Sequence, residues 1–148
     1  MRRSHIVVPV HLVWATYQRM PLIQPEWEDD LYHCIAQDAA KLRCEILALN
    51  GMPDHVHLAV MLPATVTIAS IMKQVKGNSS NFITEQILPK DSFFYWQEGY
   101  SAYGFHINLT PRVVSYIQNQ KKHHSGGTVW PTLESIGEEL PEEPKISP

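Results

Sequence analysis

The segment from His55 to Leu62, HVHLAVML, constrains the fold more than any other part of this sequence. Every second residue is apolar, and these residues share one side of an extended strand: Val56, Leu58, Val60 and Leu62. The pattern predicts a strand that buries this side and presents His55 and His57 on the other. Two such imidazoles can bind one divalent ion, although histidines that are merely hydrogen-bonded or exposed would give the same pattern.

Strand and helix patterns alternate around this segment. We predict further strands at 5–15 and 44–50, and a composite strand from two extended segments, 92–98 and 100–107, joined through Gly99. Pro9 favours an edge or a bulge in the first strand. Helical spacing occurs at 26–42, from Thr65 or Thr67 to about Leu88, and from Thr110 to Ser125. Thr110 and Pro111 are typical of a helix start, with Thr as the cap.

The order β-α-β-β-α-β-α predicts an α+β fold, an antiparallel sheet with packed helices. Its natural arrangement is a ferredoxin-like α/β sandwich. A chain of 148 residues that is 44% hydrophobic and 18% charged suits one compact domain rather than a disordered chain. We assign residues 1–131 to this domain, including the last helix at about 110–125, and residues 132–148 to an acidic, Pro-rich tail.

Neither a membrane helix nor a signal peptide is expected, because no apolar run is long enough and the N-terminus leads into a short alternating segment. Cys34 and Cys44 form no CxxC pair, which predicts reduced thiols in a cytoplasmic protein.

The net charge of −3 comes from the tail, where five acidic residues and one lysine follow Thr132, while residues 1–133 hold eleven basic and ten acidic residues. A local basic surface that binds DNA phosphates is therefore compatible with the composition. Four lysines are candidates for it, with ordinary solvated side chains as the alternative: Lys73, Lys76, Lys121 and Lys122.

The helix after Pro111 carries a second candidate group. Its apolar stripe includes Val113 and Ile117, whereas Tyr116 and Gln120 share another face, one turn apart. This spacing predicts that Tyr116 is not a core aromatic. A tyrosine packed at the edge of the helix beside a surface glutamine is the structural alternative.

Several stretches, in order, resemble the small single-tyrosine transposases of bacterial insertion sequences, the IS200-like members of the HUH endonuclease superfamily. The relatives linked to repetitive extragenic palindromes share this core. The similarity spans about His5 to His124 and rests on five stretches: HLVWAT, PDHVHLAV, VKGNSS, WQEGYSAYGF and VVSYIQNQKKHH.

The resemblance implies roles for individual residues. His55 and His57, with Gln120, would hold a divalent metal, Mg²⁺ or Mn²⁺. Tyr116 would attack a phosphodiester in single-stranded DNA and form a 5′-phosphotyrosine, releasing a 3′-hydroxyl. The resemblance also implies an enzyme that works as a homodimer, recognises DNA hairpins and can share active sites between subunits.

These residue types suit that chemistry. A bound cation withdraws charge from the phosphate, and a phenolate leaves more easily than an alkoxide, so the covalent step can be reversed to join strands. Three other readings stay open: a domesticated DNA-hairpin-binding relative without transposition activity, a metal-dependent phosphoesterase that does not need Tyr116, and a replication initiator with the same mechanism.

Some further residues have two interpretations. Aromatic side chains at Trp96, Tyr100 and Tyr103 could stack on unpaired bases or pack in the core. Asp54 is expected to form a turn. For a second group the sequence is compatible both with a structural role and with a position near DNA or metal: His11, Ser79, Ser80, His123 and His124.

Overall fold

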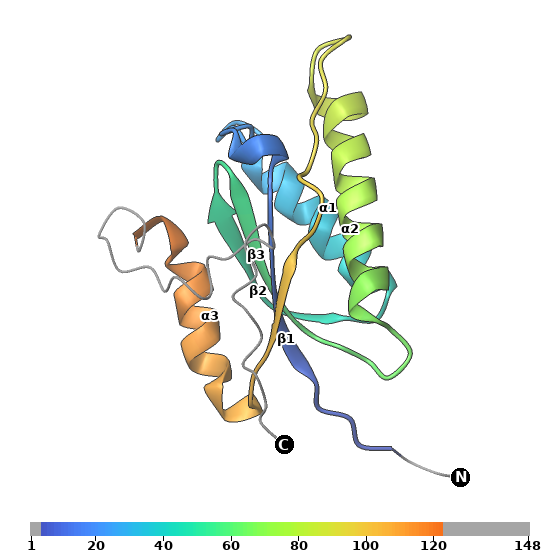
Figure 1. Ribbon diagram of the computed structural model, residues 1–148, viewed down its shortest axis with the longest axis vertical. Helices are drawn as coiled ribbons and strands as arrows, with labels where there is room; N and C mark the ends of the chain where they lie inside the picture. The colour runs from blue at the N-terminus through green and yellow to red at the C-terminus, as the bar shows by residue number, and fades with distance from the viewer. Residues whose placement is uncertain (1–3, 123–148) are drawn as a thin grey trace, which may run out of the picture.

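The computed structural model describes residues 4–122, and its centre is a four-stranded sheet (Figure 1). The strands are β1 (Pro9–Ala15), β2 (Glu45–Met52), β3 (His55–Met61) and β4 (Ser101–Gly104). They lie in the order β2-β3-β1-β4, and all three pairings are antiparallel. This order and the packed helices confirm the predicted α+β, ferredoxin-like sandwich. His123, His124 and the predicted tail lie outside the described residues.

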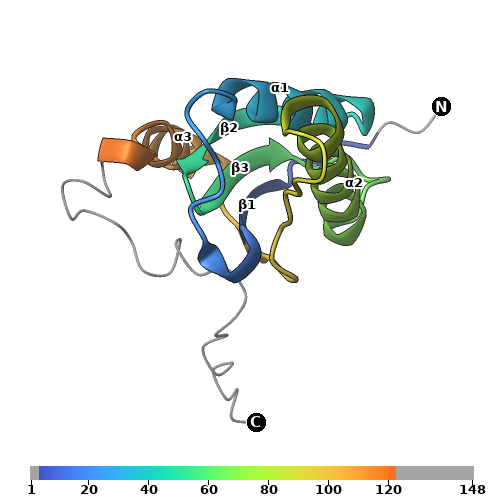
Figure 2. The same ribbon diagram turned by 90° about the horizontal axis from the view of Figure 1, so that it is seen from above.

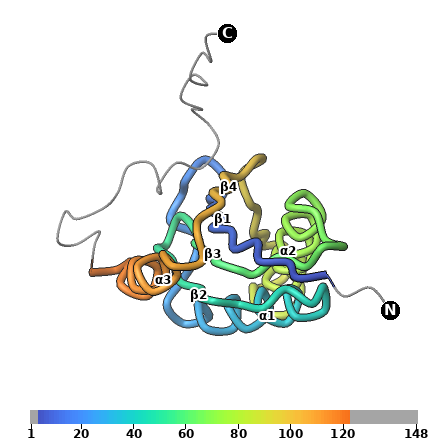
Figure 3. The backbone as a smooth tube through the Cα atoms, turned by 90° about the horizontal axis from the view of Figure 1, so that it is seen from below, coloured from blue at the N-terminus to red at the C-terminus, as the bar shows by residue number. Residues whose placement is uncertain are grey.

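Helices cover both faces of the sheet. α1 (Glu28–Lys41) and α2 (Ile68–Phe82) lie on one face, and α3 (Thr110–Gln118) lies on the other, as Figures 2 and 3 show. α2 continues into a π-helical turn, Ile83–Ile87, and short 3₁₀ turns occur at Tyr17–Arg19 and Ile107–Leu109. No helix between residues 4 and 122 is long and apolar enough to cross a membrane.

The main core lies between the sheet and the pair α1 and α2. The apolar side of β3 faces it, as the alternation predicts, and Val56, Leu58 and Val60 are fully buried. Trp14 and Phe94 add large side chains, each in a T-shaped contact with Trp96. Burying this much apolar surface provides the main driving force for folding.

A much smaller apolar cluster joins α3 to the opposite face. Val113 and Ile117 pack there against two alanines, Ala48 of β2 and Ala59 of β3. Small side chains on the sheet let the helix approach closely at this point. Val13 and Ala15 form a further small cluster with Tyr103 on this face. Between the two clusters the face carries the buried polar side chains of His11, His55 and His57, which makes it a candidate for function.

The first predicted strand was too long, and of the two positions that Pro9 favoured, an edge or a bulge, the edge is not found. Residues 5–8 are exposed and lie outside the strand, because the sheet offers them no continuous partner. β1 starts at Pro9 and lies between β3 and β4. Proline is tolerated there because, as the first residue of a strand, it needs no ladder N–H.

The predicted composite strand is also shorter than expected. Only Ser101–Gly104 forms β4, while Trp96 makes a single bridge to Thr16. Gly99 has a positive φ of 84°, which interrupts an extended backbone and explains the gap.

Met52 is the last residue of β2, so the hairpin turn between β2 and β3 consists of Pro53 and Asp54 alone.

α2 begins where one of the two candidate caps predicts. Thr67 accepts a hydrogen bond from Ser70 N, and Ser70 Oγ accepts one from Thr67 N, which completes a capping box. The Asn and Ser residues inside the helix do not break it. Asn78 Nδ2 donates to Asp38 Oδ1 of α1 at 3.1 Å, and Trp96 Nε1 donates to Ser79 Oγ at 2.9 Å.

The start and end of the last helix differ from the prediction. Leu109, not Thr110, is the N-cap residue, because a 3₁₀ turn precedes the helix and Thr110 Oγ1 donates instead to Ile107 O. α3 ends at Gln118, and Asn119 leaves the helical conformation with φ −99° and ψ 22°. The chain is helical again at 120–122, so Tyr116 and Gln120 lie on either side of a break.

Candidate active site

The site lies on the face of the sheet that α3 covers. Strand register brings His11 of β1 opposite Ala59, two positions from the pair of Val13 with His57 and four from the pair of Ala15 with His55. Because alternate residues share a face, all three histidines lie on this side of the sheet. Tyr103 of β4 pairs with His11 and lies on it too.

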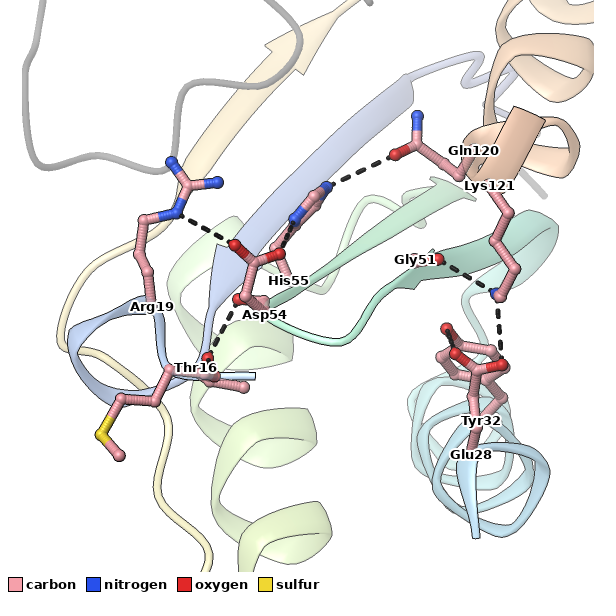
Figure 4. Close-up of polar contacts among 10 residues, drawn as sticks. Thr16, Arg19, Glu28, Tyr32, Gly51, Asp54, His55, Gln120 and Lys121 are labelled. Atoms are coloured by element: carbon pink, nitrogen blue, oxygen red, sulfur yellow. Dashed lines mark hydrogen bonds and ion pairs between the residues drawn. The ribbon is translucent and has the colours of Figure 1, made fainter. Parts of the chain in front are cut away.

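His55 is held between an acid and an amide (Figure 4). Its Nδ1 lies 2.7 Å from Asp54 Oδ1, and its Nε2 lies 3.4 Å from Gln120 Oε1. Burial raises the pKa of the Asp54 carboxyl, but the hydrogen bond and charge of His55, together with the nearby Arg19, outweigh this effect and lower it. Asp54 therefore stays ionised at neutral pH and orients the imidazole.

The second histidine is held by the third. His57 Nδ1 lies 2.8 Å from His11 Nε2, and both side chains are fully buried. In both candidate ligands another side chain engages Nδ1, so a metal would bind through Nε2. Groups that fix the tautomer and orientation of ligating histidines in this way are typical of metal sites.

Tyr116 lies against this pair. Its ring centroid is 6.0 Å from that of His57, with an interplanar angle of 77°. The side chain is only 2% exposed, and the two histidines are also buried. The expectation that Tyr116 is not a core aromatic is therefore wrong, and the two imidazoles opposite the apolar stripe are buried as well. The reason is that α3 packs on this face.

Backbone and side-chain contacts fix the chain around Gln120. Asn50 Nδ2 donates to Gln118 O at 3.1 Å, and Lys121 Nζ contacts Asn50 Oδ1, Gly51 O and Glu28 Oε1 at 3.0–3.1 Å. A Cβ at Gly51 would collide with the carbonyl oxygen of His55, so only glycine permits this close pairing beside the site. Gln120 itself is fully buried.

These residues fit a divalent cation by their donor chemistry. No group of three or more His, Cys, Asp or Glu side chains within residues 4–122 is arranged to hold a metal. A metal here would need another donor type, and Gln120 Oε1, 3.4 Å from His55 Nε2, could supply it. Two imidazole nitrogens and one amide oxygen leave coordination positions for phosphate oxygens or water.

The four candidate lysines have different surroundings. Lys73 and Lys122 are exposed, whereas Lys76 is half-buried and donates to Gln97 O and Gly99 O at 2.8 and 2.9 Å. Burial lowers the pKa of Lys76. Lys76 and Lys121 therefore both have intramolecular partners, which the charge pattern alone did not reveal.

Two participants were missed or undervalued from sequence. His11 was left without a role, and Asp54 was assigned only to a turn. Alternation in residues 9–15 does place His11 on one side with Val13 and Ala15, but its contact with His57 depends on pairing between strands 46 residues apart. Asp54 forms the turn as predicted and also contacts His55.

Comparison with known proteins identifies relatives of this architecture. The family described as "Transposase IS200 like" matches residues 5–120. The ISDra2 transposase TnpA of Deinococcus radiodurans is 26% identical over 114 residues, which cover 74% of this chain and 81% of that protein.

Two solved structures have a similar fold. A candidate transposase from Deinococcus radiodurans R1 is 26% identical, with a TM-score of 0.63, and the match covers 81% of this chain and 96% of that one. A REP-associated tyrosine transposase bound to a REP hairpin is 19% identical, with a TM-score of 0.62, and the match covers 88% and 79% respectively.

Proposed function

This chain belongs to the family of IS200-like transposases, and on that premise we propose that it is a metal-dependent endonuclease and strand transferase for single-stranded DNA. Tyr116 is the proposed nucleophile, and His55, His57 and Gln120 are the proposed metal ligands. One observation carries the proposal: β3 meets α3 and the segment that follows it, with Tyr116 of α3 beside His57 and Gln120 of that segment beside His55.

The covalent step balances without an added reactant. Tyr116 Oη bonds to phosphorus, the bond from phosphorus to the 3′ oxygen breaks, and the phenolic proton is lost while the leaving oxygen gains one. The products are a 5′-phosphotyrosine and a 3′-hydroxyl. Attack of a 3′-hydroxyl on the phosphotyrosine reverses the step and joins strands.

Each residue has a defined task in this step. A bound Mg²⁺ or Mn²⁺ would offset the negative charge that develops on the phosphate. Asp54 and His11 orient the two imidazoles through Nδ1. Because Tyr116 and both histidines are buried, DNA reaches them only after a local rearrangement of the groups that cover them.

The partners follow from the same premise. We propose single-stranded DNA with hairpin ends as the substrate, supported by a structure of the same fold that is a complex with a hairpin. A homodimer and a cytoplasmic location are also part of the proposal, and the free thiols of Cys34 and Cys44 suit a reducing compartment.

A covalent-capture assay tests the proposal. The full chain is mixed with labelled single-stranded DNA from the flanks of its gene and with Mn²⁺ or Mg²⁺, then run on a denaturing gel. We expect a slower band that requires metal and is lost in Tyr116→Phe and His57→Ala. The matched control Tyr100→Phe, a tyrosine outside the site, keeps the band.

Other outcomes would favour the alternatives. Binding of hairpin DNA with no covalent species in any metal would instead identify a domesticated binding protein. Cleavage of small phosphodiesters that survives Tyr116→Phe would identify a phosphoesterase. A replication initiator would form the same adduct but on DNA other than these flanks.

A further inference from the structure

Three exposed aromatic side chains form a row beside the site. Tyr17, Tyr95 and Phe93 are 47%, 56% and 61% exposed, and within residues 4–122 no other Phe, Tyr or Trp side chain is as exposed. The rings of Phe93 and Tyr95 are stacked, with centroids 5.9 Å apart and an interplanar angle of 10°. We call these three residues the aromatic row.

Backbone pairing places Tyr17 opposite Tyr95. Tyr17 N donates to Tyr95 O at 3.0 Å, and Gln97 N donates to Ala15 O at 2.8 Å, on either side of the bridge between Thr16 and Trp96. Phe94 and Trp96 point into the core. Because side chains alternate in extended chain, Phe93 and Tyr95 point the other way and share one face.

That face continues the face of the site. Ala15 pairs with His55, and Tyr17 lies two residues further along the same segment, a rise of about 7 Å. Thr16 Oγ1 also donates to Asp54 O at 3.1 Å, which ties the start of the row to the residue that orients His55. In Figure 1 the segment that carries Phe93 and Tyr95 reaches beyond the end of α2 before it returns to β4.

We propose that the aromatic row stacks the unpaired bases of the DNA strand that leads to or from Tyr116. This inference rests on the proposed function, because it takes single-stranded DNA as the substrate. Flat aromatic faces bind bases regardless of sequence and are typical of surfaces for single-stranded nucleic acid. Arg19 lies two residues from Tyr17 and pairs with Asp54 at 3.6 Å, yet its side chain is 41% exposed. The exposed part of its guanidinium would contact the accompanying phosphates.

Unpaired bases suit the row better than a second copy of the chain. A stable dimer interface buries roughly 800 Å² per partner around an apolar centre, and three rings supply only a fraction of that. Exposed Met20 adds one apolar side chain near Tyr17, but other neighbours of the row are polar: Gln18 N donates to Gln97 Oε1, and Gln18 Nε2 donates to Tyr17 Oη. Lys90 and Asp91 precede Phe93 in exposed positions.

The test compares binding and cross-linking of DNA. The probe is a labelled single strand from the gene's flanks, its thymines replaced by 5-iodouracil, and a second strand of equal length carries abasic sites. The variants are Tyr17→Ser, Tyr95→Ser and Phe93→Ser, each checked for an unchanged melting temperature. Ile6→Ser is the matched control because Ile6 is also exposed, at 43%, but lies outside the row.

We expect each ring substitution to weaken binding of the intact strand roughly 10-fold, with no such loss for Ile6→Ser or on the abasic strand. Photocross-links should map to the row. Cross-links that map elsewhere, or equal affinity of all variants, would overturn the inference. A change in oligomeric mass without a change in DNA affinity would also overturn it and identify an interface between copies.

Failure of this inference can be separated from failure of the proposed function. If the metal-dependent adduct at Tyr116 forms but the ring variants bind DNA normally, only the aromatic row is refuted. If no adduct forms while the rings still govern binding, the surface stands and the proposed chemistry fails.

Discussion

At the scale of single residues, the contact between His11 and His57 sets which nitrogen faces the proposed metal. A His57 that binds metal through Nε2 carries its proton on Nδ1 and donates it to His11 Nε2. Removing the acceptor in His11→Leu should therefore lower Mn²⁺ affinity roughly 10- to 100-fold. In His11→Gln an amide oxygen takes about the place of Nε2, so the loss should be smaller.

Electron paramagnetic resonance of Mn²⁺, titrated without DNA, measures this effect independently of catalysis. His33→Gln is the control, since His33 is exposed on α1. Unchanged Mn²⁺ affinity in His11→Leu would mean that His11 does not position His57.

The sequence predicted part of this arrangement. Alternation in HVHLAVML correctly placed His55 and His57 on one side and the apolar residues on the other. It could not reveal burial by α3, because burial depends on packing between elements distant in sequence. The contact between His11 and His57 could not be predicted for the same reason.

At the scale of elements, the start of α2 offers a direct comparison of two threonines. Thr67 makes the capping box, whereas Thr65 lies exposed before the helix. Thr67→Ala should lower the free energy of unfolding by about 1 kcal/mol, and Thr65→Ala should change it by less than about 0.5 kcal/mol. Urea denaturation of both variants checks this, and equal effects would contradict the assignment of the cap.

The segment after α3 allows a similar comparison of two lysines. Lys121 contacts Glu28, Asn50 and Gly51, but it is half exposed, so Lys121→Ala should cost only about 1 kcal/mol of stability. Lys122 is exposed and is a candidate DNA contact. Its removal should reduce the slope of log binding constant against log salt concentration for a single strand by about 0.7.

Binding isotherms at several salt concentrations and urea denaturation separate the two roles. An unchanged salt slope in Lys122→Ala would contradict its role as a DNA contact, and unchanged stability in Lys121→Ala would contradict the role of its contacts.

Element types were more predictable than their limits. Helical spacing and the Pro and Gly positions indicated the three main helices and the central strands. The break at Asn119 was not predictable, because it accompanies bonds from its own side chain to Ser115 and from Asn50 to Gln118 O. β1 became an inner strand despite Pro9, since β4 pairs with it only from Val10 onward.

At the scale of the whole molecule, one chain contains every proposed catalytic group. Tyr116 contacts His57 of its own sheet, and Gln120 contacts His55. In a homodimer built from such chains, each site would be complete within one subunit. An exchange of α3 between subunits would instead pair the tyrosine of one chain with the histidines of the other.

Mixing two inactive variants distinguishes these arrangements. Tyr116→Phe lacks the nucleophile and His57→Ala lacks a ligand, so sites complete within a chain give no covalent adduct in a mixture refolded together. Exchanged helices would create one intact site in each mixed dimer and restore about a quarter of the adduct if subunits assort randomly and the two sites act independently. The packing of α3 on its own sheet through Ala48, Ala59, Val113 and Ile117 leads us to expect no adduct, and a restored band would show that α3 leaves its own sheet in the working assembly.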